Sequence, residues 1–155
     1  MMFREMRKKD RKLENTEALE ILKKCNYGVL STVGENGYAY GVPISYVYVN
    51  GGIYFHSALE GSKLENIRLN HSVSFCVVGD TLLLPDKFST NYESVIAFGK
   101  ALEVSGIEKK EALSALVDKY SSQYREKGQE YIEKASEKTR VIKINIEHLS
   151  GKARR

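Results

Sequence analysis

The sequence predicts an α+β fold in which a mostly antiparallel β-sheet closes, fully or partly, into a barrel with flanking helices. About six apolar, β-branched segments occur along the chain, and short turns containing glycine or asparagine join the first three, as in antiparallel hairpins. Roughly three or four helical segments accompany them without a repeating strand–helix–strand pattern, which argues against a doubly wound parallel sheet. With 155 residues, the chain has the length of one domain, which we expect to span residues 1–155.

The first part of the chain predicts one helix followed by a meander of three strands. Residues 16–25 place Ala18, Leu19, Leu22 and Cys25 at helical spacing, with Thr16 as a possible N-cap. The segments 27–33, 38–50 and 53–57 are extended, apolar and separated by the turns GENG and GG. Pro43 lies inside the second strand and has no N–H for a ladder, so we expect an edge, a bulge or a departure from the sheet there.

The middle of the chain predicts a short helix and two further strands. Ser62 and Glu65 fit the capping box S-x-x-E at the start of a helix that ends near Asn70. The nearly continuous apolar run 73–79 predicts a strand covered on both faces. We expect residues 80–91 to form a long connection and 92–104 a long strand that bends at Gly99.

The last part predicts helical segments and a final strand. An apolar stripe on a polar background predicts a helix over about 108–127, followed by a short helical piece at 129–135. Partial alternation predicts a strand over 139–147. Residues 148–155 are expected to be a basic tail.

Charge and cysteine content limit the classes of function. The net charge of +4 comes largely from the basic termini, residues 1–12 and 148–155. These ends permit nucleic-acid binding, but no base-reading motif accompanies them, so we favour solvated termini and expect no nucleic-acid partner. Cys25 and Cys76 lie in apolar stretches and are interpreted as buried free thiols in a reducing, cytoplasmic compartment. No apolar run reaches the roughly 20 residues of a membrane span, so no membrane partner is expected.

Candidate chemistry concentrates where the third strand passes into the short helix. His56 and Ser57 end the strand, and Gly61, Ser62 and Lys63 begin the helix. A helix N-terminus with a hydroxyl and an ammonium group suits a phosphate. The simpler alternative is that Ser62 only caps the helix and Lys63 is only solvated, and the residues alone leave both open. The three histidines are scattered, so a metal site is not expected, and no catalytic residue can be assigned.

Several longer segments together resemble a known family. Four segments are similar to the nitroimidazole-resistance (Nim) branch of the pyridoxamine 5′-phosphate oxidase-like flavoproteins. They are YGVLSTVGENGYAYGVPISYVY, IYFHSALEGSKLENIRLNHSVSFCVVG, FSTNYESVIAFGKA and GKARR. The resemblance runs from about Met6 to the C-terminus. It implies a split β-barrel that forms a homodimer with FMN at the subunit interface.

The resemblance also implies a set of cofactor-binding residues. The flavin phosphate is expected against Ser57, Ser62 and Lys63, with His56 beside the phosphate or the ribityl chain. The flavin ring is expected along the strand segment Val42, Pro43, Ile44 and Ser45. The partner subunit is expected to contribute the strand around Tyr92, Glu93 and Ser94, and Lys152 from its C-terminal segment.

The family's activity then gives two functional hypotheses. The first is an FMN-dependent oxidoreductase that takes electrons from NAD(P)H and reduces a small acceptor such as a nitroimidazole. The second is a flavin- or haem-binding module for sensing or storage with little turnover, because one fold hosts several functions. The chain departs from the family's pattern at Ser62, where many relatives have histidine, so any role of that histidine is doubtful here.

Overall fold

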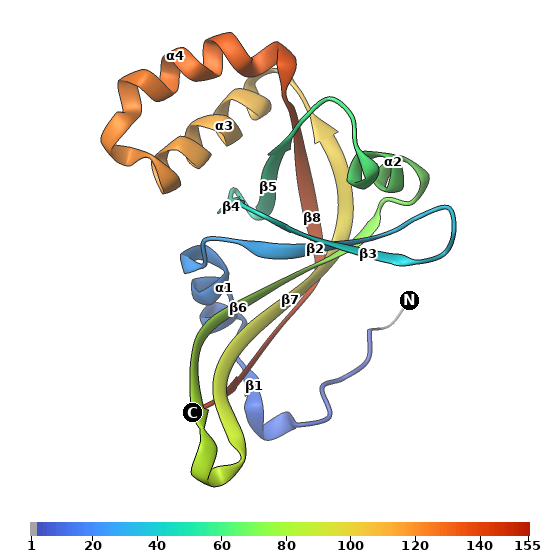
Figure 1. The fold of residues 1–155 in the computed structure, drawn as a ribbon, viewed down its shortest axis with the longest axis vertical. Helices are drawn as coiled ribbons and strands as arrows, with labels where there is room; N and C mark the ends of the chain where they lie inside the picture. The colour runs from blue at the N-terminus through green and yellow to red at the C-terminus, as the bar shows by residue number, and fades with distance from the viewer. Residues whose placement is uncertain (1–2) are drawn as a thin grey trace.

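A computed structural model describes residues 3–155, which form an eight-stranded, entirely antiparallel sheet with four α-helices (Figure 1). The predicted α+β split barrel is confirmed. Seven strands follow the order β3-β2-β6-β7-β8-β5-β4, and β1 pairs with β8 outside this path. The strands are β1 (Lys12–Leu13), β2 (Gly28–Val33), β3 (Ala39–Ile44), β4 (Val47–Val49), β5 (Gly52–Ser57), β6 (Ser72–Leu84), β7 (Ser89–Val104) and β8 (Arg140–Arg154).

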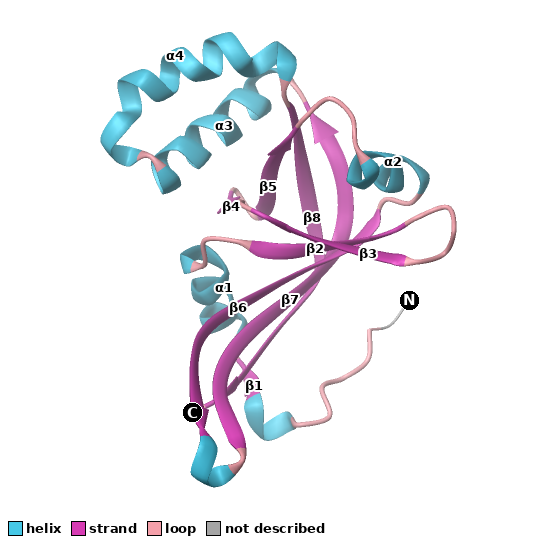
Figure 2. Ribbon diagram, viewed as in Figure 1, coloured by secondary structure: helices cyan, strands magenta, loops and turns pink. Residues whose placement is uncertain are grey.

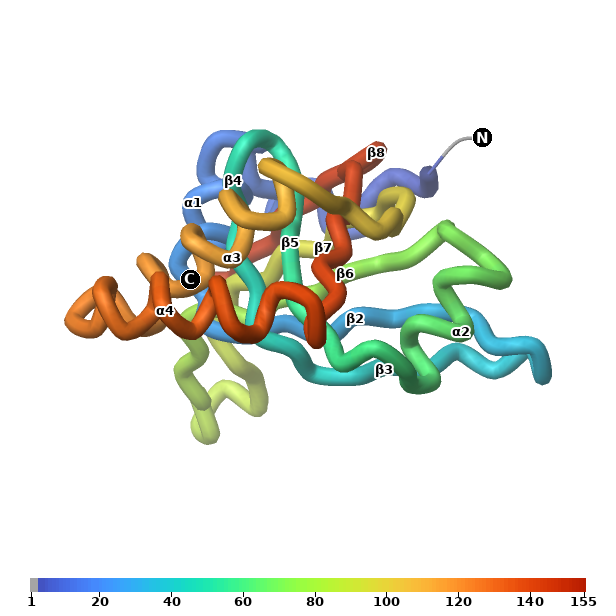
Figure 3. Tube along the Cα trace, turned by 90° about the horizontal axis from the view of Figure 1, so that it is seen from above, coloured from blue at the N-terminus to red at the C-terminus, as the bar shows by residue number. Residues whose placement is uncertain are grey.

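The helices occupy three separate places around this sheet (Figure 2). They are α1 (Asn15–Lys24), α2 (Ser62–Leu69), α3 (Gly106–Tyr120) and α4 (Arg125–Ala135). The view from above shows α3 and α4 together on one side of the molecule and α2 on another (Figure 3). The helix expected over 108–127 is therefore two helices, because a turn at Ser121 and a short 3₁₀ segment, Ser122–Tyr124, separate them.

The barrel is split between two strands that are consecutive in the chain. The segment predicted as one strand, 38–50, is β3 followed by β4, and these lie at opposite ends of the strand order. Only Ser45 and Tyr46 connect them. Pro43 lies opposite Val29 in β3, which is an edge strand, so its missing N–H costs no ladder hydrogen bond.

One face of the sheet builds the main core. Leu30, Phe75 and Val77 alternate inward on β2 and β6 and are almost fully buried. Ala18 and Leu22 of α1 belong to the same core, so one face of this helix packs against the sheet. A smaller cluster joins α3 and α4 to the outside of β4, β5 and β8 through residues that include Val47, Leu116 and Ile132.

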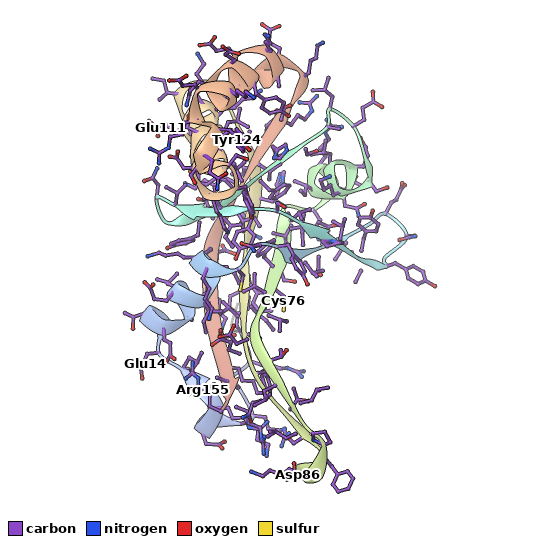
Figure 4. All side chains as sticks on the ribbon, turned by 60° about the vertical axis from the view of Figure 1, so that its left-hand side comes forward. Glu14, Cys76, Asp86, Glu111, Tyr124 and Arg155 are labelled. Atoms are coloured by element: carbon purple, nitrogen blue, oxygen red, sulfur yellow. The ribbon has the colours of Figure 1, made fainter. Side chains whose placement is uncertain are left out.

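The expected connection at 80–91 is instead a two-stranded ribbon. Strands β6 and β7 continue past the barrel as a hairpin, after an irregularity between Val78 and Thr81, and turn at the short 3₁₀ segment Pro85–Lys87. Asp86 marks this tip in Figure 4. The sequence did not reveal the ribbon, because the apolar side chains of this segment are not buried in a core: Leu83 is 73% and Phe88 97% exposed.

The burial of β6 also differs from the prediction, which expected both faces of this strand to be covered. Cys76 was expected in the core, but it is half-buried on the outer face (Figure 4), whereas Cys25 is buried. In register with Cys76 lie Val29 of β2 and Ile96 of β7, both 38% exposed. Strand β6 is thus covered on one face only within this chain.

The C-terminal segment is not a tail. Residues 148–154 continue β8, where they pair with β7, and Lys12 and Leu13 of β1 pair with Lys152 and Gly151. Residues 9–12, of which three are basic, form a 3₁₀ turn and the start of β1, while residues 1–2 lie outside the described part. Within residues 3–155, no helix is long and apolar enough to cross a membrane.

Candidate functional site

The loop from β5 into α2 forms a cradle at the start of a helix. Gly61 is the N-cap residue, with φ at +150°, a backbone conformation that favours glycine. Ser62 is the first helical residue, and its side chain makes no capping bond. The capping box with Ser62 as N-cap is therefore wrong. The exposed Ser62 hydroxyl is left available beside the first N–H groups of α2, which have no partner within the helix.

His56 and Lys63 flank this cradle. Partial burial, followed by the positive charge of Lys63, lowers the pKa of His56, so the two side chains are close enough to interact electrostatically. Ser57 is buried, and its hydroxyl donates to the carbonyl oxygen of Ala58 at 2.8 Å. Ser57 can therefore accept a hydrogen bond from a ligand more readily than it can donate one. The predicted phosphate residues do lie together at the end of β5 and the start of α2.

Arg140 is part of this cradle and was missed from the sequence. It pairs opposite Ser57 in the sheet, and its Nε donates to the carbonyl oxygen of Leu59 at 2.9 Å. Its Nη1 binds both carboxylate oxygens of Glu103 at 3.0 Å. Arg140 thus fixes the loop before α2. Its role depends on a strand pairing across more than eighty positions, for which the sequence gives no signal.

Ser62 provides a test that separates a ligand contact from a helix cap. Because its hydroxyl caps nothing, Ser62→Ala should change the free energy of unfolding by less than about 0.5 kcal/mol, whereas loss of a true cap costs about 1 kcal/mol. The same variant should weaken FMN binding about 2- to 10-fold, the value of one hydrogen bond. Urea titration and flavin fluorescence titration measure the two effects. A clear loss of stability with unchanged flavin affinity would restore the capping interpretation.

The segment Val42–Ser45 ends at the split in the barrel. Val42 and Ile44 are half-buried, whereas Pro43 and Ser45 are exposed. Tyr46 follows and is fully buried, but neither its N–H nor its carbonyl oxygen belongs to the sheet ladder, which ends at Ile44 and resumes at Val47. Buried main-chain groups need partners, so the sheet alone does not account for this position.

Helix α3 supplies those partners through its last two side chains. The Tyr46 N–H donates to the Tyr120 hydroxyl at 2.9 Å. The carbonyl oxygen of Tyr46 lies 2.6 Å from the same hydroxyl and accepts from Lys119 Nζ at 3.0 Å. Lys119 also donates to the carbonyl oxygen of Cys25 at 2.6 Å. Helix α3 thereby holds the main chain directly after the segment that is expected to carry the flavin ring.

Removing the Tyr120 hydroxyl should destabilise the main chain between β3 and β4, where the barrel is split. Tyr120→Phe leaves the buried Tyr46 N–H without its acceptor, which we expect to lower the free energy of unfolding by about 1–3 kcal/mol. Tyr131→Phe is the control, since it removes a hydroxyl from an exposed ring of α4 and should be neutral. Urea denaturation compares the two. Equal stability of both variants would show that Tyr120 does not support Tyr46.

Ser45 and His56 line one groove, which joins the split in the barrel to the end of β5. Its other wall is formed by α3, α4 and the turn between them. The structure therefore brings the expected ring segment and the expected phosphate cradle to neighbouring positions in one subunit. Within residues 3–155, no cluster of histidine, cysteine or acidic residues could hold a metal ion.

The remaining predicted residues form a second group on β7 and β8. Ser94 pairs opposite Lys152, and Tyr92 pairs opposite Arg154. Partial burial raises the pKa of Tyr92, but hydrogen bonds from Arg11 and Lys152 outweigh it, so the net shift is downward. This group lies toward the ribbon, whereas the cradle lies beside α2 (Figure 1).

Glu93 lies between Tyr92 and Ser94 in β7 and is only 7% exposed. It binds Lys24 Nζ at 2.5 Å and accepts from the Asp80 N–H at 3.1 Å, and Arg155 lies at 3.4 Å. Its burial favours the neutral acid, but the bond from Lys24 outweighs this and lowers the pKa of Glu93 overall. Glu93 thus anchors α1 to the ribbon, and its carboxylate is engaged by these contacts within the chain.

Comparison with known proteins adds a family and a fold. The sequence profile described as pyridoxamine 5′-phosphate oxidase matches residues 14–153. A protein described as a candidate 5-nitroimidazole antibiotic resistance protein, from Bacteroides thetaiotaomicron, superposes with a TM-score of 0.78 at 23% identity, over 92% of this chain and 86% of that one. No curated protein matches the chain.

Two further solved structures share the fold. A conserved hypothetical protein from Mycobacterium tuberculosis gives a TM-score of 0.81 at 17% identity, over 96% of this chain and 90% of that one. A FAD- and haem-binding protein from Mycobacterium smegmatis gives 0.72 at 19% identity, over 92% and 73%. At these identities, the likeness establishes a common architecture.

Proposed function

Since the chain belongs to the pyridoxamine 5′-phosphate oxidase family, we propose that it is a flavoprotein that holds FMN at the β5–α2 cradle. The observation that supports this most is the start of α2, where Ser62 exposes its hydroxyl and the charge of Lys63 is close enough to His56 to lower its pKa. These groups suit a phosphate, because the helix N-terminus adds its own N–H donors and partial positive charge.

The surroundings of the cradle also fit such a cofactor. A Cβ added at Gly61 would meet nothing within 4 Å, so the space in front of the helix is open. The adjacent edge strand, with exposed Pro43 and Ser45, leaves main-chain groups free for the rim of a flavin ring. Arg140 keeps the loop in place. Bound flavin would supply reversible two-electron chemistry, which no side chain of this cradle offers.

We further propose that two copies form a homodimer and complete the site. Val29, Cys76 and Ile96 make an apolar row on the outer face of the sheet, and the ribbon adds the exposed Leu83 and Phe88. Apolar side chains that gather on one exposed face are typical of a protein contact. A second copy placed there could contribute Tyr92, Ser94 and Lys152 to the cradle of the first. Sedimentation equilibrium should give twice the chain mass.

As the reaction, we propose a nitroreductase-like transfer from NAD(P)H to a small acceptor such as a nitroimidazole, as in the Nim branch. One nicotinamide supplies a hydride, a further proton is taken up, and the nitro group becomes a nitroso group with release of water. The candidate resistance protein with the same fold supports this choice of acceptor. The free thiols of Cys25 and Cys76 agree with a reducing, cytoplasmic setting.

The decisive experiment is an anaerobic reduction of the purified protein. A yellow protein whose flavin absorbance is bleached by NADH or NADPH, and recovers when a nitroimidazole is added, would support the oxidoreductase. Flavin that neither nicotinamide reduces would favour the second candidate, a flavin- or haem-binding module, which the FAD- and haem-binding structure of the same fold suggests. A protein that stays colourless after incubation with FMN would refute the oxidoreductase, and one that stays colourless after incubation with FMN and with haem would refute both.

A further inference from the structure

A groove lined mainly by α3, α4 and the turn between them opens beside Ser45 and His56 of the barrel. This α3–α4 groove encloses about 570 Å³, within the range of roughly 300–1,000 Å³ typical of small-molecule sites. Its floor is apolar, formed by Leu113, Leu116 and Ile132, which also anchor the helix pair to the barrel. Since these side chains are held by packing, the groove is preformed.

Three tyrosine rings border the groove. Tyr124 and Tyr131 lie seven residues apart, two helical turns, and therefore share one side of α4 and its leading turn. Both are 57% exposed, and Figure 4 shows Tyr124 on the helix pair. Tyr120 is the third, but its hydroxyl is engaged with Tyr46, so it offers a ring face or edge. Rings arranged around an apolar floor favour a flat aromatic ligand.

The charges around the groove argue for an uncharged ligand. Lys127 is the charged side chain lining it among residues 3–155, and it is exposed at the rim, 5.7 Å from the Tyr124 ring. Lys119 of the same helix pair is directed to carbonyl oxygens of Cys25 and Tyr46. A charged molecule seated on the floor would lose its hydration without a buried partner, which is costly.

The position of the groove links it to the proposed flavin site. Ser45 and His56 line its barrel end, and both belong to the residues expected around FMN. A molecule in the groove would therefore lie against the edge of the cradle. A second protein copy is a poorer occupant, because the outer face of β2, β6 and β7 offers that copy a separate apolar surface.

We propose that the α3–α4 groove binds an uncharged, planar aromatic molecule of one or two rings, and that this is the class of acceptor reduced at the flavin. Only the second statement, that such a molecule is reduced at the flavin, rests on the proposed function. It assigns substrate selection to the helix pair between β7 and β8, while the barrel and α2 hold the cofactor.

Calorimetric titration with indole tests the groove without any turnover. Indole is neutral and planar, and indole-3-carboxylate is its charged match. In FMN-loaded protein we expect indole to bind, and the carboxylate to bind at least about tenfold more weakly. The double variant Tyr124→Ala/Tyr131→Ala should weaken indole binding by about tenfold or more and leave FMN affinity unchanged. The control Ile107→Ala removes an exposed apolar side chain of α3 outside the groove, 76% exposed, and should change neither.

The outcomes separate this proposal from the proposed function. If FMN binds but indole does not, or if the double variant binds indole like the wild type, the groove assignment is wrong. If the double variant instead changes the sedimenting mass, the groove is a subunit contact and the proposal is also wrong. If FMN does not bind but indole binds and depends on the two tyrosines, the cofactor proposal fails and the aromatic site stands. A melting curve for each variant confirms its folding.

Discussion

Lys63→Ala is expected to weaken FMN binding by about 10- to 100-fold, the loss of one charge-assisted hydrogen bond of roughly 1.5–3 kcal/mol. Lys63 lies in the first turn of α2, where its charge adds to that of the helix N-terminus. The variant should keep its stability, because Lys63 makes no ion pair in the structure of residues 3–155. Flavin fluorescence titration measures the affinity directly.

A second readout does not require flavin at all. The charge of Lys63 is one of the two causes that lower the pKa of His56, so Lys63→Ala should raise that pKa in the flavin-free protein. Proton NMR of the imidazole follows the titration. Lys110→Ala removes an equal charge from the exposed surface of α3 and is the control for both measurements. If Lys63→Ala left FMN affinity unchanged, the phosphate would have to bind elsewhere.

Gly99→Ala should destabilise the fold by about 1–3 kcal/mol or more. The register between β7 and β8 shifts between Phe98 and Gly99, and this irregularity brings the main chain of β8 against the Gly99 Cα. A Cβ there would overlap the carbonyl oxygen of Asn145, which is main chain and cannot rotate away. Chemical denaturation should therefore show a lower midpoint.

Gly41→Ala is the matched control for this substitution. It also adds a methyl group to a strand glycine, but the new atom meets only the ends of the Val29 and Ser31 side chains. Those side chains can shift slightly, so the midpoint should stay close to that of the wild type. Two variants with the same midpoint would mean that the close approach at Gly99 is not as rigid as described.

Local patterns predicted the fold well wherever a segment's environment follows from its own residues. The bend at Gly99 and the edge position of Pro43 were expected and are confirmed. The expected three-strand meander holds only for its first hairpin, because β3 and β4 lie at opposite ends of the strand order and β5 pairs with β4 and β8. The ribbon of β6 and β7 and the end of β8 were read as a loop and a tail. In both cases the partner strand, not the local composition, decides the structure.

The candidate site shows the same limit. Ser62 and Lys63 could be found because a helix start is a local feature, although the capping role given to Ser62 was wrong. Arg140, Lys119 and Tyr120 could not, since each acts on main chain more than seventy residues away. A sequence pattern reveals residues that face a ligand more easily than residues that hold the backbone in place.

The place of β8 in the sheet has a consequence for folding during synthesis. It is the last strand in the chain, yet it lies between β7 and β5 and also pairs with β1. Until it emerges from the ribosome, one edge of β5 and one edge of β7 have no hydrogen-bonding partner, and the barrel stays open. Closure then depends on contacts between distant parts of the chain, which form slowly. We therefore expect nascent chains that lack β8 to need a chaperone to keep them from aggregating.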